Sequence, residues 1–403
     1  MSAKTERTAM PGPMAGIRVV DLSAVVSGPM AAGMLADQGA DVIKVESRAG
    51  DLTRRIGPAR GDLTSTFASI NRGKRSIVLD LKQLAAREVL RELVASADVL
   101  VENFRPGAMA RLGFAYEDVR AYNPRIVYLS ISGFGQDGPY SGQRVYDPVI
   151  QAVSGFADAH PDPTTGEPQS LPTVLCDKIT ALTAAQALAA ALHARHATGE
   201  GRRIELSMLD AAVSFLWPEA FYNHALLDVP PQPVPEFGAS QRLWRCRDGW
   251  FAMTTPQDDE FAAMCRAFGT PELIGDARFD TIPKRRANHP ALRTILEPIA
   301  AQQDVDPFVA RLAAEGVPAG KVNRKHELAD DPQVRHNGTL VDVEYPGIGR
   351  VRTPRPAATF SGDSPDAAQR RAPGLGEHTR AILRELGRDD VRIAALFASG
   401  AAG

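Results

Sequence analysis

Two carboxylates in the middle of the chain stand where an acid could do chemistry. Asp177 follows the apolar run LPTVLC and opens a long stretch rich in Ala and Leu, which Thr198 and Gly199 close. Asp is a favoured N-cap and Gly a favoured stop, so this stretch is predicted to be a helix that Asp177 caps. Asp210 follows the alternating apolar residues of IELSML, which predict a strand, and begins a second predicted helix.

The carboxylate of Asp177 has two possible roles. In the first it is an ordinary helix cap, which is the common role of Asp at such a position. In the second, the N–H groups and the positive dipole end of the helix keep the carboxylate ionised in a site with little water. Such a carboxylate is a nucleophile that can attack an acyl group and hold it as an anhydride. The wider sequence has to decide between the two roles.

Basic residues gather in loops that follow predicted strands. They are Arg72, Lys74, Arg75 and Lys82 in NRGKRSIVLDLK, and Arg105 and Arg111 in and after VENFRPG. Cations at consecutive strand ends could hold phosphate groups, while the neighbouring Phe104 stacks on a flat ring. A third loop, SISGFGQDGPY, has backbone N–H groups near Gly133 to Gly135 that could stabilise an oxyanion.

Alternating strands and helices position these loops. IRVVDL, MAAGMLADQG and DVIKVE are predicted as strand, helix and strand, and the alternation repeats through SIVLDL, LAAREVLRELVASA, DVLVE and RIVYLSIS. This pattern predicts an α/β fold with a Rossmann-like, doubly wound parallel sheet, in which ligands bind at the carboxyl ends of strands. A nicotinamide dinucleotide is disfavoured, because the first turn reads GPMAAG and lacks the paired early glycines.

Length and composition set the class of protein. The 403 residues, 44% of them hydrophobic, favour two domains with a substantial core. The net charge of −2 gives no general attraction to nucleic acid or anionic lipid, so an anion site must be local. Cys176, Cys246 and Cys265 have neither metal-ligand nor disulfide spacing, which predicts no metal site and a reducing compartment.

Neither a secretory signal nor a membrane span is expected. The first thirteen residues lack the apolar core of a secretory signal. The Ala-rich helix after Asp177 contains Gln186 and His193 and is bracketed by Lys178 and Arg195, which disfavours a membrane span. We therefore expect a soluble, cytoplasmic protein with no nucleic acid or membrane partner.

The chain changes character after Ala212. The proline-rich connector DVPPQPVPEFG precedes a predicted smaller α+β domain with the strand GWFAMTT and helices near 259–268 and 289–301. TLVDVEYPGIGRVRTP then predicts a hairpin, and GLGEHTRAILRELG a helix that Glu377 and His378 open. The predicted division is 14–224 for the N-terminal part of the large domain, 225–331 for the linker and small domain, and 332–403 for a return segment that completes the large domain.

With these motifs in view, the chain resembles the family III CoA transferases, which include formyl-CoA transferase and carnitine CoA-transferase. The resemblance covers nearly the whole sequence and rests on GIRVVDLSAVVSGP, ADVIKVE, NRGKRSIVLDLK, ADVLVENFRPG, NPRIVYLSISGFGQDGPY, TGEGRRIELSMLDA and LGEHTRAIL. It implies that Asp177 is the nucleophile and that the large domain binds CoA. It also implies an interlocked homodimer, in which each chain threads through a ring made by the other.

The resemblance assigns a set of CoA-binding positions. They fall on Val26, Ser27, Arg48, Leu79, Lys82, Asn103, Phe104, Arg105 and Arg111. Two departures predict fewer or shifted phosphate contacts: Ser47, with Arg48 beside it, stands at a position that can be arginine, and Ser132 stands at a basic position. The glycine-rich loop that covers the site in formyl-CoA transferase is replaced by FGASQR around Gly238, which leaves the shielding of an anhydride open.

Two alternatives remain open at this point. The related α-methylacyl-CoA racemases pair an aspartate with the histidine of a GHD-type motif, but the corresponding stretch here is RVYDPV, with Tyr146 before Asp147. Racemisation needs two matched acid–base groups, and without that histidine the second is missing, which favours a transferase. Asp147 and Asp210 are instead predicted to cap their own helices. The other alternative is a CoA-binding protein without turnover.

The favoured function is transfer of CoA from an acyl-CoA donor to a free carboxylic acid through aspartyl anhydride and enzyme–CoA thioester intermediates. Acyl-CoA is then a substrate, and no permanently bound cofactor is expected. The sequence does not identify the donor or the acceptor, and a dicarboxylate donor such as succinyl-CoA is only a preference.

Overall fold

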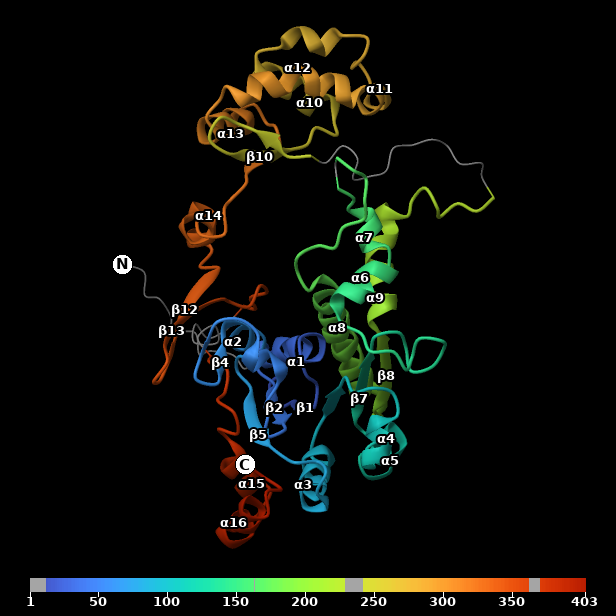
Figure 1. Cartoon of the computed structure of the whole chain (residues 1–403), viewed down its shortest axis with the longest axis vertical. Helices are drawn as coiled ribbons and strands as arrows, with labels where there is room; N and C mark the ends of the chain where they lie inside the picture. The colour runs from blue at the N-terminus through green and yellow to red at the C-terminus, as the bar shows by residue number, and fades with distance from the viewer. Residues whose placement is uncertain (1–11, 163, 229–241, 362–369) are drawn as a thin grey trace. The chain divides into compact units, whose positions relative to one another are not determined.

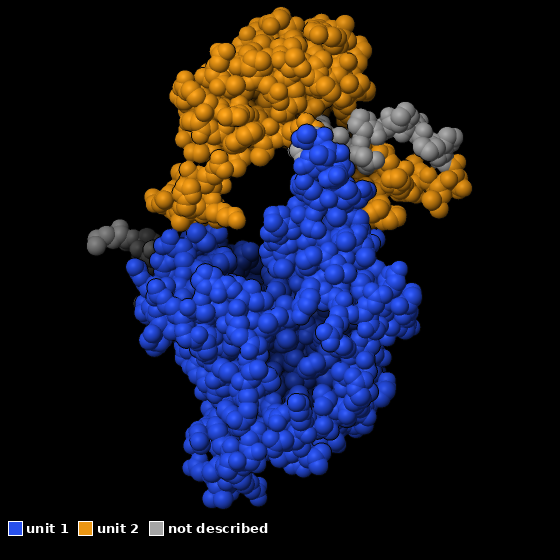
Figure 2. Space-filling model, in the orientation of Figure 1, with its two compact units in different colours: residues 1–216, 336–403 blue, residues 217–335 orange. Residues whose placement is uncertain are grey.

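The computed structural model describes residues 12–162, 164–228, 242–361 and 370–403. The chain divides into two compact units (Figure 2): unit 1 comprises Met1–Leu216 and His336–Gly403, and unit 2 comprises Trp217–Arg335. The loop around Gly238 and nearly all of the proline-rich connector lie outside the described residues.

Unit 1 is built on a six-stranded, all-parallel sheet with the order β5-β2-β1-β6-β7-β8 (Figure 1). Its strands are β1 (Arg18–Asp21), β2 (Asp41–Glu46), β5 (Arg75–Val78), β6 (Val99–Glu102), β7 (Val127–Ser132) and β8 (Arg202–Ser207). The chain moves outward from β1 in one direction and then from β6 in the other, which is the order of a Rossmann sheet. The predicted α/β fold is confirmed, and the turns after β1 and β6 lie next to each other at the switch point.

Helices pack on this sheet. The helices of unit 1 are α1 (Ser27–Asp37), α2 (Ser65–Ile70), α3 (Leu84–Ala95), α4 (Ala108–Leu112), α5 (Tyr116–Tyr122), α6 (Asp147–Val153), α7 (Phe156–Ala159), α8 (Leu175–Thr198), α9 (Met208–Ala220, whose last turn belongs to unit 2), α15 (Thr379–Glu385) and α16 (Asp390–Ala398), with the 3-10 helix η1 (Leu52–Arg55). Helices α1 and α8 pack against each other and against the strands. Helices α1 and α8 therefore lie side by side in the same helical layer against the sheet.

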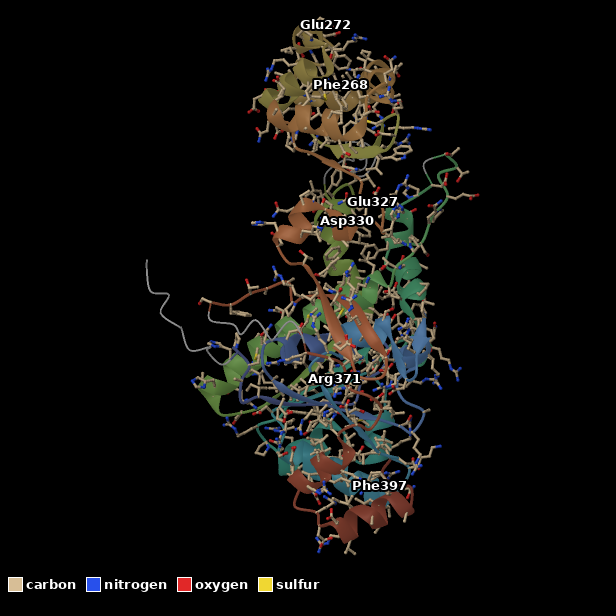
Figure 3. All side chains as sticks on the ribbon, turned by 90° about the vertical axis from the view of Figure 1, so that its left-hand side faces the viewer. Phe268, Glu272, Glu327, Asp330, Arg371 and Phe397 are labelled. Carbon is tan, nitrogen blue, oxygen red and sulfur yellow. The ribbon has the colours of Figure 1, made fainter. Side chains whose placement is uncertain are left out.

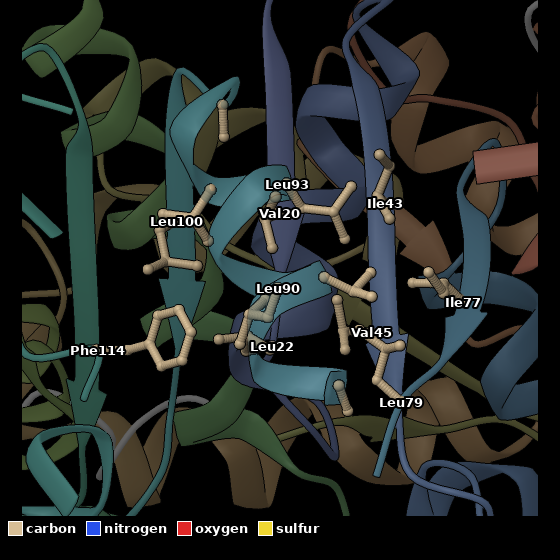
Figure 4. Close-up of a cluster of buried hydrophobic side chains, with 14 of the residues drawn as sticks. Val20, Leu22, Ile43, Val45, Ile77, Leu79, Leu90, Leu93, Leu100 and Phe114 are labelled. Carbon is tan, nitrogen blue, oxygen red and sulfur yellow. The ribbon is translucent and has the colours of Figure 1, made fainter. Parts of the chain in front are cut away.

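A buried apolar cluster joins the sheet to other helices. Leu90 and Leu93 of α3 lie over Val20 of β1 and its neighbours (Figure 4), and Ile382 of α15 and Ile393 of α16 complete the cluster. These side chains are almost fully removed from water. Burial of each one stabilises the fold by about 1.5–3 kcal/mol, so the sheet is a rigid base for the loops at its carboxyl edge.

The return segment completes unit 1. It contains the predicted hairpin, β12 (Leu340–Tyr345) paired with β13 (Gly349–Pro354), which packs near α2 and the short pair β3 (Ala59–Arg60) and β4 (Leu63–Thr64). Arg371, labelled in Figure 3, forms an ion pair with Glu377 just before α15. Residues 401–403 then lie along the end of β5, where Gly403 donates its N–H to the carbonyl of Val78 (3.2 Å).

Unit 2 has its own core. Its antiparallel sheet has the order β11-β10-β9, and Phe268, labelled in Figure 3, packs edge-on against Phe308 with ring centres 4.9 Å apart. The elements are β9 (Trp244–Arg245), β10 (Trp250–Met253), β11 (Ala319–Lys321), α10 (Asp258–Phe268), η3 (Pro271–Gly275), α11 (Ile282–Ala287), α12 (His289–Ala301), α13 (Val305–Ala314), η4 (Leu328–Asp330) and α14 (Pro332–His336, which ends in unit 1). This is the smaller α+β unit that the sequence predicts.

Helix α8 has one further property. By length and composition alone it could cross a membrane, with a mean hydropathy of 1.2, and half of that apolar window is buried inside the protein. A core helix of a soluble protein passes the same test.

Candidate active site

Asp177 lies in the first turn of α8, but it is not the N-cap. Helix α8 begins at Leu175, its N-cap is Val174, and Asp177 is the third helical residue. The predicted capping role is therefore wrong, because the helix starts three residues earlier than the sequence pattern indicates. The side chain is only 7% exposed. A carboxylate in this position is close to the unpaired N–H groups and positive dipole end of the helix.

Asp147 caps α8 rather than its own helix. It is the first residue of α6, whose N-cap is Tyr146, and its Oδ2 accepts the backbone N–H of Asp177 at 2.8 Å. The predicted local capping role is wrong, because a residue thirty positions away along the chain supplies the N–H. Two buried carboxylates, 1% and 7% exposed, thus meet at the start of α8.

Asp210 has neither burial nor such a partner. It is the third residue of α9 and is exposed, and its backbone N–H donates to Oγ of Ser207 at 3.2 Å. Ser207 therefore caps α9, and the predicted capping role of Asp210 is wrong. Of the two candidate acids, only Asp177 lies in a site that excludes water.

The surroundings of Asp177 raise the pKa of its carboxyl above the ordinary value for aspartate. Burial and, after it, the negative charge of Asp147 raise the pKa of Asp177, hydrogen bonds from the hydroxyl and backbone N–H of Ser27 oppose both effects, and the resulting pKa is about 6. Among the residues that the structure describes, no cation acts on this carboxyl. At pH 7 most Asp177 is ionised and poorly hydrated, and it has no counter-ion among the described residues, which are the properties of a carboxylate nucleophile.

The neighbouring thiol is not a second nucleophile. Cys176 is fully buried, and burial together with the charges of Asp147 and Asp177 raises the pKa of its thiol to about 12. The thiolate is the reactive form of cysteine, and it is not populated at neutral pH with such a pKa.

The turn between β1 and α1 faces this site. Val25 is the one non-glycine residue with a positive φ (69°) in the part of the chain that the structure describes, a strained conformation for a β-branched side chain. Asn103 holds the turn from the adjacent strand: its Oδ1 accepts the N–H of Ala24 and its Nδ2 donates to the carbonyl of Ala24, both at 2.8 Å. Val26 and Ser27 follow this turn at the start of α1, where both are buried.

Three of the predicted phosphate-binding cations have partners inside the protein. Lys74 is buried and donates to Oδ2 of Asp21 at 2.7 Å, so its proposed contact with phosphate is wrong. Arg72 pairs with Asp37 at 2.6 Å, and Arg75 pairs with Asp41 and Glu385. These ion pairs tie residues 72–75 to α1, to the neighbouring strands and to α15, an arrangement that the spacing of charges along the chain does not reveal.

Other predicted CoA-binding residues lie at the sheet edge. Lys82 is exposed, whereas the Leu79 side chain is buried in the apolar core and only its backbone could contact a ligand. Arg48 is exposed and donates to the carbonyl of Ala402 at 3.2 Å.

A hollow of about 150 Å³ lies beside the VENFRPG loop. Phe104 and Arg105 line it together with Glu102 and Arg203, and Phe104 is 36% exposed. An exposed ring beside guanidinium groups suits a flat aromatic ligand with nearby phosphates. Arg111 is exposed on α4 but does not line this hollow.

Two further features bear on the chemistry. Within the described ranges, no group of three or more His, Cys, Asp or Glu side chains could hold a metal ion. The N–H of Gly135 donates to Oγ of Ser132 at 3.1 Å, so it is not free to stabilise an oxyanion as predicted. Ser132 is one of the two positions that depart from the expected basic residues.

Comparison with known proteins identifies the family. The sequence profile described as CoA-transferase family III matches residues 14–379. The chain belongs to this family. The succinyl-CoA:glutarate CoA-transferase of Mus musculus is 34% identical over 96% of this chain and 90% of its own length, and the formyl-CoA:oxalate CoA-transferase of Shigella sonnei is 34% identical over 96% and 99%.

A solved structure agrees with this assignment. The crystal structure of a CAIB/BAIF family protein from Brucella suis superposes with a TM-score of 0.81 at 35% identity, covering 94% of this chain and all of that one. The protein is thus a family III CoA-transferase, with acyl-CoA as its substrate. The structure adds Ser27, Asp147 and Gln151 as polar residues that hold Asp177 or its segment, which sequence reasoning missed or assigned to other roles.

Proposed function

We propose that this family III CoA-transferase works by covalent catalysis at Asp177. The observation that carries the proposal is a buried carboxylate with a raised pKa, on which no cation acts within the described part of the chain. A counter-ion would lower the nucleophilicity of the carboxylate and bind it in the ground state. Ser27 instead supplies two neutral hydrogen bonds, which orient the carboxylate and favour its ionised form by lowering its pKa.

The proposed reaction has four acyl-transfer steps. The Asp177 carboxylate attacks the thioester carbonyl of the donor, which forms a mixed anhydride and releases the CoA thiolate. The thiolate attacks the aspartyl carbonyl, which gives an aspartyl–CoA thioester and frees the donor acid. The acceptor carboxylate attacks this thioester, which forms a second anhydride and releases the thiolate again. The thiolate then attacks the acceptor's acyl carbonyl, which regenerates Asp177 and yields the new acyl-CoA.

CoA is proposed to bind at the carboxyl edge of the sheet. Lys82 and Arg48 are exposed there for phosphate groups, and Phe104 and Arg105 line the hollow suited to the adenine end. Arg111 follows on α4. Val26 and Ser27 lie at the start of α1, where their backbone faces the thioester end of CoA.

The substrates are proposed to be small dicarboxylates. Support comes from the similar CoA-transferases, whose names specify succinyl-CoA with glutarate and formyl-CoA with oxalate. Succinate, glutarate and oxalate are dicarboxylates, whereas formate is not. The active form is proposed to be an interlocked homodimer in the cytoplasm, as expected for the family. Equilibrium sedimentation at several protein concentrations tests the dimer.

The decisive experiment traps Asp177 covalently. The protein is incubated with succinyl-CoA and other acyl-CoAs, treated with hydroxylamine, digested, and the peptide holding Asp177 is analysed by mass spectrometry. We expect a hydroxamate at Asp177 with the donor acyl-CoAs. Asp210→Asn is the matched control, because Asp210 is also the third residue of a helix but is exposed.

Two results would reject the proposal. If Asp177→Ala transfers CoA at the native rate, Asp177 is not the nucleophile. If Asp177 stays unlabelled while solvent deuterium enters the α-carbon of an acyl-CoA, the protein exchanges protons as a racemase does.

A further inference from the structure

Gln151 is a buried side chain that the proposed mechanism does not use. It lies on α6, one helical turn after Asp147, and both residues are 1% exposed. Its Nε2 donates to Oδ1 of Asp147 at 2.6 Å and to the carbonyl of Thr173 at 2.9 Å, with a longer contact to the carbonyl of Leu171 at 3.3 Å. Its Oε1 accepts the N–H of Leu171 at 2.8 Å. Every polar atom of this carboxamide is therefore bonded.

The hydrogen bonds of Asp147 and Gln151 converge on the segment that carries the nucleophile. Gln151 holds the backbone of Leu171 and Thr173, and Asp147 holds the N–H of Asp177. Residues 172–174, which link Leu171 to the first residue of α8, are exposed and form neither a helix nor a strand. Their position consequently depends on the two side chains of α6.

A simple cap does not require this arrangement. A neutral Ser, Thr or Asn would cap α8 about as well as Asp147 does. A buried carboxylate beside a second carboxylate is unfavourable unless its oxygens are bonded. Both oxygens of Asp147 are bonded, one to Gln151 and one to Asp177. The pair therefore holds a negative charge at a fixed place next to the nucleophile.

We propose that Asp147 and Gln151 form a two-residue bracket that positions segment 171–177, and with it the Asp177 carboxylate, for attack on the acyl-CoA. Both are positioning residues, because neither touches the reacting atoms. The bracket rests on the proposed role of Asp177 as nucleophile. Displacement of a reacting group by about 1 Å lowers a rate by about 100-fold, so loss of the bracket slows acylation without weakening CoA binding.

The test compares Gln151→Ala with Gln169→Ala. Gln169 lies on the same stretch of chain, but it is exposed and its Nε2 donates to Asp162 at 2.8 Å, outside the bracket. The rate of hydroxylamine-trapped labelling of Asp177 is measured in a single turnover, together with the Kd for CoA and the far-UV circular dichroism. Gln151→Asn is a milder variant, one methylene shorter, for use if Gln151→Ala does not fold.

We expect Gln151→Ala to label Asp177 at least about tenfold more slowly than wild type, with a Kd for CoA within about twofold. Gln151→Asn changes in the same direction by less, and Gln169→Ala labels at the wild-type rate. The bracket is overturned if a folded Gln151 variant labels at the wild-type rate, or if Gln169→Ala slows labelling equally. Wild-type protein that never labels overturns the nucleophile and the bracket together.

The variant Asp147→Asn removes the negative charge of Asp147 and keeps nearly the same side-chain shape, so it tests the role of that charge. Asp147 is the charged group that acts on Asp177, and Ser27 provides the neutral contacts. Removing the charge lowers the pKa of Asp177 and moves the acid limb of kcat/KM to lower pH, whereas Gln151→Asn leaves that limb in place. A residue that only supported the fold would not move the limb, so an unmoved limb in Asp147→Asn rejects a role for its charge.

Discussion

Two of the groups of buried carboxylates in unit 1 differ in their partners. Asp21 lies in a network of opposite charges, with Nζ of Lys74 at 2.7 Å and Nζ of Lys44 at 4.0 Å. The lysines lower the pKa of Asp21, although burial alone would raise it. Asp177 faces another carboxylate, Asp147, and its pKa is raised to about 6. Similar burial thus has opposite results, and the nearby charges decide which.

The Asp21 network supports the fold, whereas the Asp177 carboxylate is suited to reaction. The charges of the Asp21 network are neutralised within the protein, and Lys74 also donates to the carbonyl of Pro29 and Oδ1 of Asn71. That network fixes the base of the turn that precedes α1. The Asp177 carboxylate keeps its charge uncompensated, which is unfavourable for folding and favourable for attack on a carbonyl.

Replacing Asp177 gives the largest expected effect on activity. Asp177→Asn should lower transfer by at least about 10³-fold, because the nucleophile is lost, while CoA still binds. The same variant should be more stable than wild type at pH 8 by up to about 3 kcal/mol, since a pKa raised from 3.8 to about 6 makes the charged form unfavourable in the fold. Activity assays and urea unfolding measure the two effects. A loss of both activity and stability would contradict the comparison.

Breaking the other network should affect stability instead. Lys74→Met leaves Asp21 buried without its nearest cation and should destabilise the protein by about 3–5 kcal/mol. Burial lowers the pKa of Lys74 to about 8, so the pair is charged at pH 7, where urea unfolding should be measured. Arg75→Met is the neighbouring control. Its ion pairs are partly exposed, so the loss should stay within about 1 kcal/mol.

Much of the fold could be predicted from local patterns. The nearly continuous apolar residues of DVIKVE and DVLVE predict parallel strands that are covered on both faces, and both strands are buried. Gly199 ends α8 as predicted. The alternation of strands and helices then determines the sheet type. Helix starts were less predictable: α8 begins before Asp177, because Asp147 supplies its cap from a distant position.

The site could be predicted only in part. Asp177 could be predicted from its sequence context and from the family resemblance. The local sequence does not distinguish Lys74, which is buried, from Lys82, which is exposed. Ion pairing across the sheet decides their roles, and sequence spacing does not encode it. Gln151 carries no sequence signal at all, because a buried glutamine is recognised only once its four backbone and side-chain partners are known.

The pH dependence should show the raised pKa directly. Asp177 must be ionised to attack, so kcat/KM should fall about tenfold per pH unit below a midpoint near 6. Because the folded pKa lies above the unfolded value, the contribution of Asp177 to stability is lost as pH rises from about 4 to 6 and stays absent above. Activity therefore rises over the same window in which this contribution falls. A flat rate between pH 5 and 8 would show that Asp177 is paired after all.

The smallest expected effects belong to the exposed cations that lie outside both networks. Lys82→Ala and Arg105→Ala should each raise the KM for acyl-CoA by about three- to tenfold and leave kcat nearly unchanged, because a contact with a remote phosphate binds the ground state and transition state equally. Arg384→Ala is the control, since this exposed arginine pairs with Asp390 on the surface at 2.9 Å. A fall in kcat with an unchanged KM would place Lys82 or Arg105 at the reacting end of the substrate. Equal KM changes in all three variants would point to a general effect of surface charge, and the proposed phosphate contacts would then be wrong.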